Sequence, residues 1–171
     1  MKKLTKLEEL QIINELITRS NLIDSGSSRA VFNYGADKVV KVVCEDEGRI
    51  QNKKEVEMYE RYGYKGYLAE IYAYGKNIII MEKVKTSVRH MSDEQRRQYD
   101  VIEDFLDTVL GTTDCMQVGI NKHDNVVCYD YGFDIDDSGY NVGRISRIIT
   151  NKGVHGMLKF TKSSIMDSVF K

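Results

Sequence analysis

The stretch LIDSGSSRAVFNYGADKVVKVV, residues 22–43, decides the fold that this chain can adopt. Its last six residues are rich in β-branched side chains, which are typical of a strand. A short turn at 35–37 precedes that strand, and the Gly/Ser-rich segment 25–28 forms an earlier turn. Because both connections are short, neighbouring strands must run antiparallel. The stretch therefore predicts three antiparallel strands, at 21–24, 29–34 and 38–43.

On both sides of this stretch the spacing of apolar residues changes to that of a helix. Residues 4–19 and 48–62 repeat apolar side chains every three to four positions with charged residues between them, which predicts two amphipathic helices. Two further strands are predicted at 67–73 and 77–81. We therefore expect an α+β fold, with a five-stranded antiparallel sheet and one helix across it.

The second half of the chain opens with a strong helix signal. Ser92 is a good N-cap, and Gln95 follows it three residues later, which is the capping-box pattern. Gly111 stands where a helix commonly ends, and 125–129 is a short strand candidate. This half therefore predicts a small, mainly helical lobe.

Composition excludes several classes of protein. The 171 residues carry 25 Lys+Arg against 26 Asp+Glu, a net charge of −1, so a uniformly basic nucleic-acid binder is disfavoured. No stretch approaches the ~20 apolar residues that a membrane span needs, and the N-terminus lacks the apolar core of a signal peptide. Three cysteines without a CxxC pair argue against a disulfide framework or a zinc site. We expect a soluble, cytoplasmic protein with no membrane partner.

The segment 22–43 also contains residues that are suited to binding phosphate. A Gly/Ser-rich turn between strands can direct backbone N–H groups and hydroxyls at phosphate oxygens. Lys41 points to the opposite sheet face from its neighbours Val40 and Val42, and an inward lysine needs an anion such as Glu55 on the next helix. The alternative interpretation places Lys41 on a solvated sheet face and makes the turn only a turn. The local sequence leaves both open.

The order of these parts resembles the protein-kinase-like superfamily over residues 20–135. A Gly-rich hairpin, a lysine strand, an acidic helix, two strands and the segment 78–84 are similar to its N-terminal lobe. A helix, a loop and then Asp130-Tyr131-Gly132 are similar to its helical lobe, where Asp-Phe-Gly usually stands. The likeness is strongest to the short, divergent kinase-like proteins of bacterial viruses and to small-molecule kinases. It implies a two-lobe fold, with an N-terminal helix at 1–20, a kinase-like N-lobe at 21–84 and a reduced helical C-lobe at 85–171.

The resemblance implies roles for particular residues. Lys41 would contact the α/β-phosphates of ATP and pair with Glu55, with Glu57 as the second choice. Asp130 would hold a magnesium ion. Residues implied to bind the nucleotide through the turn and at the hinge are Ser25, Gly26, Ser27, Ser28, Arg29, Glu82 and Val84.

The catalytic loop departs from the family pattern. Gln117 aligns with the metal-binding Asn, which puts Thr112 at the position of the base Asp. A threonine cannot accept the substrate proton as a carboxylate does, although Asp114 lies two residues on and is a candidate substitute. With only 39 residues after Gly132, we expect a pseudokinase-type binding or inhibitory module that keeps ATP and magnesium binding. The alternative is an active phosphoryl- or nucleotidyl-transferase that uses Lys41, Glu55 and Asp130.

Partner expectations rest on the C-terminal segment. Residues 141–171 carry six Lys or Arg against one Asp, so an acidic protein surface or a nucleic acid could bind there. The acidic turn 134–139 starts like a calcium loop but has Ile145 where such a loop needs a bidentate Glu. The three histidines match no ligand spacing. We expect a protein partner whose identity the sequence does not give.

Overall fold

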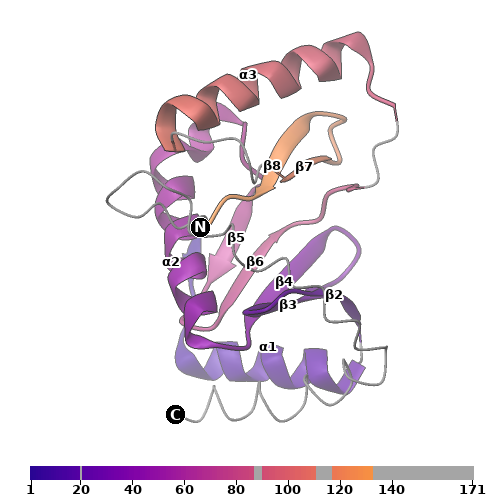
Figure 1. Ribbon diagram of the computed structural model, residues 1–171. Coiled ribbons are helices and arrows are strands. Elements are labelled where there is room, and N and C mark those ends of the chain that lie inside the picture. Colours follow the sequence, from indigo (N-terminus) through magenta and orange to yellow (C-terminus); the bar gives the residue numbers. More distant parts are fainter. Residues whose placement is uncertain (20, 87–89, 111–116, 133–171) are drawn as a thin grey trace. The chain divides into compact units, whose positions relative to one another are not determined.

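The computed structural model of the protein describes residues 1–19, 21–86, 90–110 and 117–132. These residues form two compact units, drawn together in Figure 1. The first contains Met1–Lys53 and Ile71–Glu82, and the second contains Lys54–Glu70 and 83–132. Five features singled out in the sequence lie outside the described residues: Gly111, Thr112, Asp114, the acidic turn 134–139 and the basic segment 141–171.

The first unit is built on a six-stranded sheet with the order β1-β5-β6-β4-β3-β2. Strand β4 matches its predicted bounds, and its neighbour β6 pairs with it through Val40 and Ile80. The predicted strands 38–43 and 77–81 therefore do share one sheet. The strands of this unit are β1 (Lys2–Lys3), β2 (Leu22–Ser25), β3 (Arg29–Asn33), β4 (Lys38–Val43), β5 (Ile71–Tyr74) and β6 (Ile78–Glu82).

The prediction of five antiparallel strands is wrong in one respect. Strands β2 to β6 pair antiparallel as expected, but β1 adds a sixth strand, which runs parallel to β5 and makes the sheet mixed. Two exposed lysines carry no alternating apolar pattern, so nothing in the sequence marks β1 as a strand. Backbone bonds hold it instead, and the Leu4 N–H extends the pairing by donating to the Tyr74 carbonyl at 2.8 Å.

Helix α1 (Lys6–Arg19), predicted at 4–19, covers one face of this sheet. Ile13 and Leu16 pack against the side chains that β3, β4 and β6 direct toward α1, and all of them are buried. Period-two alternation places these sheet residues on one face. The sheet residues of this core are Ala30, Phe32, Val40, Val42, Ala73, Ile78 and Ile80.

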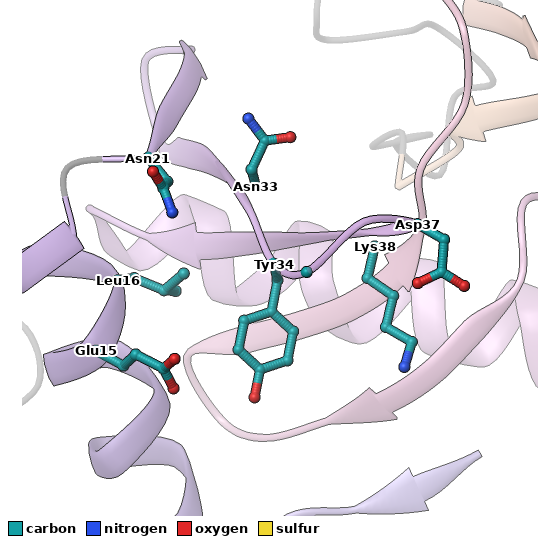
Figure 2. Close-up of a pocket in the computed structure, with 8 residues that line it drawn as sticks. Glu15, Leu16, Asn21, Asn33, Tyr34, Asp37 and Lys38 are labelled. Carbon is teal, nitrogen blue, oxygen red and sulfur yellow. The ribbon is translucent and has the colours of Figure 1, made fainter.

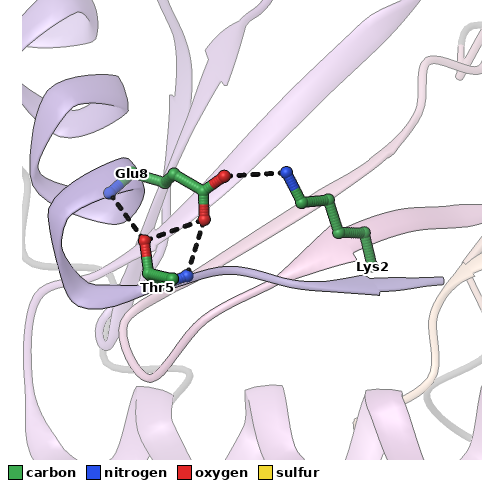
Figure 3. A network of polar contacts seen from close by, with 3 residues as sticks. All are labelled: Lys2, Thr5 and Glu8. Carbon is green, nitrogen blue, oxygen red and sulfur yellow. Dashed lines mark hydrogen bonds and ion pairs between the residues drawn. The ribbon is translucent and has the colours of Figure 1, made fainter.

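A capping box that the sequence analysis overlooked begins α1 (Figure 3). The Glu8 carboxylate accepts hydrogen bonds from the N–H and the hydroxyl of Thr5, both at 2.8 Å, and one from the Lys2 ammonium at 2.7 Å. The Glu8 N–H donates back to the Thr5 hydroxyl at 3.3 Å. The hydrogen bond from Lys2 and those from Thr5 lower the pKa of Glu8 to about 2. Lys2, in strand β1, is thereby tied to the start of the helix.

A buried polar network joins the helices to the sheet at the β5–β6 turn. Glu9 of α1, only 4% exposed, accepts a hydrogen bond from the Asn77 backbone N–H. The Asn77 carbonyl accepts from the Val43 N–H at 2.8 Å, and its side-chain oxygen accepts from Arg49 Nε at 3.0 Å. Helix α2 (Asp46–Tyr62) carries Arg49, so one asparagine links α1, β4 and α2.

The second unit contains the end of α2, a short 3-10 helix (Gly63–Lys65), α3 (Asp93–Leu110) and the hairpin of β7 (Gln117–Ile120) and β8 (Val126–Asp130). The predicted capping box of α3 is confirmed. The Gln95 N–H donates to the Ser92 hydroxyl at 3.2 Å, and the Ser92 N–H donates to the Gln95 side chain at 3.0 Å. Among the described helices, none is long and apolar enough to cross a lipid bilayer.

The predicted strand 67–73 divides between the two units. Its second part begins β5, whereas Tyr67 and Ala69 exchange backbone hydrogen bonds with Cys128 of β8, both at 2.8 Å. On the same unit, Lys85 pairs with Ile120 of β7 through two backbone bonds of 2.8 and 3.0 Å. The short segments 67–69 and 84–86 therefore extend the β7–β8 hairpin from both sides.

Candidate functional site

The Gly/Ser turn of the first unit is fixed by the segment that follows β4. The Ser28 carbonyl accepts from the N–H groups of Cys44 and Glu45 at 2.8 and 3.3 Å, and the Ser28 hydroxyl donates to Gln51 Oε1 at 2.8 Å. Ser28 is buried, whereas Gly26 and Ser27 are exposed. Of the predicted phosphate-covering residues, the exposed tip therefore consists of Gly26 and Ser27, with Ser25 half-buried beside it.

Helix α2 reaches this turn because its third residue is a glycine. A Cβ atom on Gly48 would overlap the Ser28 carbonyl oxygen and would lie 3.0 Å from Arg29 Cγ. Only a residue without a side chain allows the helix and the turn to approach so closely. Gly48 is therefore a positioning residue for the turn, which the sequence analysis did not identify.

Arg29 extends from the turn toward the same helix. It is 9% exposed, and its Nη1 donates to Asn52 Oδ1 at 3.3 Å. Asn52 itself is buried, and within the described part of the chain its Nδ2 has no hydrogen-bond partner. Arg29 is thus held on the α2 side of the sheet, where its cationic charge is largely removed from water.

Lys41 lies on that same side of the sheet. It stands opposite Val31 of β3 and Ile79 of β6, and Arg29 shares its face because it is two residues from Val31. Lys41 is 5% exposed, so the interpretation that placed it on a solvated sheet face is wrong. The first unit therefore carries two buried cationic side chains on neighbouring strands.

The two acids considered as partners for Lys41 differ in how exposed they are to solvent. Glu55 is 0% exposed, whereas Glu57, two residues on, lies on the solvent side of α2. Glu55 is three residues from Asn52, so helical periodicity places both on one face of α2. Glu55 is therefore the stronger choice, and its pairing with Lys41 stays a prediction.

The predicted metal ligands Asp130 and Gln117 are brought together in the second unit. They are directly opposite each other in the β7–β8 ladder, next to an irregularity in its register. Residues opposite each other on neighbouring strands have Cβ atoms roughly 4.5–5.5 Å apart. A carboxylate and an amide carbonyl are both oxygen donors of the kind that Mg²⁺ prefers. This pair fits a magnesium ion whose remaining ligands are phosphate oxygens or water.

Tyr131, the residue after Asp130, anchors this end of β8. Its hydroxyl donates to the Ala69 carbonyl at 3.0 Å, and its side chain is 1% exposed. Burial raises the pKa of Tyr131 well above its ordinary value, and the negative charge of Glu55 raises it further. In the second unit, Glu55 therefore lies close enough to Tyr131 for its charge to act on the tyrosine hydroxyl.

The predicted hinge residues occupy different settings. Glu82 ends β6, is 5% exposed, and stands opposite Lys38 in the ladder. Val84 belongs to the second unit and packs closely on Gly119. A Cβ atom added to Gly119 would lie 2.6 Å from Val84 Cγ2. Their backbone roles at a nucleotide stay predictions.

The described residues show no sign of a reactive cysteine or of a metal site built from protein side chains alone. Cys44 and Cys128 are buried thiols that form no disulfide, and burial raises the pKa of the Cys44 thiol, which disfavours a reactive thiolate. Within the described ranges there is no group of three or more His, Cys, Asp or Glu side chains that could hold a metal ion by itself. A cation at Asp130 and Gln117 would therefore take its remaining ligands from water or from a bound molecule.

Comparison with known proteins adds no family assignment. No protein-family model matches the chain, and no curated protein matches it.

Proposed function

We propose that the protein is a miniature kinase-like binding module of the pseudokinase type, which holds ATP and Mg²⁺ and engages a protein partner. The order of its parts supports this proposal. A Gly/Ser hairpin, a lysine strand, a helix with a buried glutamate and two more strands follow one another, and the five strands are neighbours in one sheet. This is the arrangement that the family resemblance implies for nucleotide binding.

The burial of Lys41 is the observation that carries the proposal. Removing an ammonium group from water is costly unless an anion compensates it. Lys41 is 5% exposed on β4, in the middle of the sheet, and Arg29 lies on the same face. With Arg29 beside it on the same face, Lys41 gives this side of the sheet a concentration of positive charge, which suits negatively charged phosphates.

The opposed pair Asp130 and Gln117 supports a role for magnesium. When bound there with a nucleotide, the ion would neutralise part of the phosphate charge. Asp130 would supply the carboxylate and Gln117 the amide oxygen. Gln117 is longer and less rigid than the asparagine of active kinases, which favours a single, weakly held ion.

Slow or absent phosphoryl transfer follows from the residue at the base position. Thr112 has no carboxylate, and general-base assistance is typically worth ~10²–10⁴-fold in rate. Its loss leaves nucleotide binding intact, since binding depends on other groups. A fold that binds nucleotide without turnover suits a scaffold or an inhibitory module.

A thermal-shift titration with ATP, with and without Mg²⁺, tests the proposal. At ATP concentrations of about 100 times Kd, binding should stabilise the protein by ~2.7 kcal/mol, which raises Tm by roughly 5–10 °C for a chain of this size. Lys41→Met and Asp130→Asn should each reduce the rise, measured from the variant's own Tm. Lys122→Met and Asp107→Asn change the same charges at exposed positions and should leave the rise unchanged.

Two outcomes would show that the proposal is wrong. If ATP with Mg²⁺ leaves Tm unchanged in the wild-type protein, nucleotide binding is wrong. If the protein instead labels a defined substrate with phosphate or nucleotide, and Asp114→Ala abolishes the labelling, the alternative of an active transferase replaces the pseudokinase. The opposed Asp130 and Gln117 favour that alternative, because they offer a metal position that catalysis also needs.

A further inference from the structure

A polar pocket of about 280 Å³ lies in the first unit, between the C-terminal part of α1 and the β3–β4 turn. It is formed by the last turns of α1, the start of β2 and the β3–β4 turn, as Figure 2 shows. Lys38 lines it, and Lys38 and Lys41 are three residues apart on β4 and so point to opposite faces. The polar residues that line the pocket are Glu15, Asn21, Asn33, Tyr34, Asp37 and Lys38.

The walls of the pocket are held by backbone contacts. The Asn33 N–H donates to the Asn21 carbonyl at 2.9 Å, and the Tyr34 N–H donates to the Lys38 carbonyl at 3.0 Å. Gly35 provides the positive φ of 75° that the turn between β3 and β4 requires. Leu16, which also lines the pocket, is 2% exposed and belongs to the core. The backbone around the pocket is therefore fixed by hydrogen bonds.

The pocket has a negative character. Two carboxylates, Glu15 and Asp37, face one lysine, and the ammonium of that lysine lies 5.1 Å from the centre of the Tyr72 ring, which is not part of the lining. Anionic ligands are therefore disfavoured.

The residues that line the pocket favour an organic cation over a metal ion. Two carboxylates are too few to hold a metal ion by themselves, and the described residues contain no group of three metal-binding side chains. Figure 2 shows the Tyr34 ring between the side chains of Glu15 and Lys38, where an aromatic face can attract an organic cation. The amides of Asn21 and Asn33 can accept hydrogen bonds from N–H donors.

We propose that this pocket binds a small organic ammonium compound, of the size and charge of a polyamine, through Glu15, Asp37 and Tyr34. The volume of about 280 Å³ lies just below the ~300–1,000 Å³ that is typical of small-molecule sites, so only a small ligand fits. The proposal is independent of nucleotide binding, because neither Lys41 nor the Gly/Ser turn 25–28 lines the pocket.

Spermidine is a suitable probe, and binding can be followed by the rise in Tm at constant ionic strength. We expect Glu15→Gln and Asp37→Asn each to weaken binding about two- to fivefold, the effect of one solvent-accessible ion pair. Glu60→Gln removes the same charge at an exposed position of α2 outside the pocket and should leave binding unchanged. Asp37 is exposed, so its variant should fold even if Glu15→Gln does not.

Three results would overturn the proposal. Spermidine could leave Tm unchanged, or NaCl or MgCl₂ at matched ionic strength could reproduce the whole shift, which would indicate general screening of the acidic surface. Glu60→Gln could weaken binding as much as Asp37→Asn does, which would indicate attraction to net charge rather than to the pocket. The loss of ATP binding in Lys41→Met should leave the spermidine response intact, so the two proposals fail separately.

Discussion

Replacing Gly48 with alanine should destabilise the protein, although the same change in most helices is stabilising. In an exposed helix interior, alanine is favoured over glycine by ~1 kcal/mol. At Gly48 the new Cβ would overlap the Ser28 carbonyl oxygen and would approach the Ser28 carbonyl carbon to 3.3 Å. Both atoms belong to backbone that hydrogen bonds to Cys44 and Glu45 hold in place. Overpacking typically costs 1–3 kcal/mol, and an overlap with fixed backbone belongs in the upper part of that range. After the ~1 kcal/mol gain in helix propensity, we therefore expect a net loss of about 1–2 kcal/mol.

Urea unfolding followed by circular dichroism or by the fluorescence of the 11 tyrosines measures this change, since the chain has no tryptophan. In a thermal unfolding scan of the same variant, Tm should fall by roughly 2–8 °C for a chain of this length. Gly26→Ala is the matched control in the same turn, because its Cβ would meet only the Arg29 carbonyl oxygen at an ordinary 3.8 Å. A Gly48→Ala protein as stable as the wild type, or more stable, would refute the close approach of α2 to the turn.

Three further predictions follow from single contacts. The lowered pKa of Glu8, about 2, contributes stability that is present above pH 4.5 and is lost as the pH falls toward 2; Tm profiles of wild type and Glu8→Gln should therefore differ above that window and converge below it. Tyr131→Phe removes the hydrogen bond to Ala69 and should cost about 0.5–1.5 kcal/mol in urea unfolding, and an unchanged midpoint would contradict the contact. Ser92→Ala removes the N-cap of α3 and should cost about 1 kcal/mol, whereas Ser92→Asp should retain most of the stability.

The site could be predicted only in part from the sequence. Alternation around Lys41 correctly indicated a face opposite to Val40 and Val42, but alternation does not say which of the two faces is dry. The structure decides this by burying Lys41, and it also buries Ser28, whose hydroxyl was expected at the phosphates and is bonded to Gln51. Asn52 and Gly48 were overlooked because their importance comes from residues about 20 positions away in the chain.

The sequence by itself determined the local elements whose signals lie within a few residues. The β-branched run 38–43 defined β4, and the pair Ser92 and Gln95 defined the start of α3, since strand alternation and helix capping depend on neighbouring positions. Even there, spacing misjudged single positions. Ile50 is one of the apolar residues whose spacing predicted the helix at 48–62, and it is 51% exposed on α2.

Only the tertiary structure decided which segments pair. Lys2 and Lys3 become a strand because β5 offers an open edge, and the segment 67–73 divides because β8 takes its first part through Cys128. Asp130 and Gln117 meet for the same reason, across a ladder whose register the sequence does not encode locally. Backbone N–H and C=O groups are nearly the same in every residue, so the identity of a pairing partner depends on packing between distant parts of the chain.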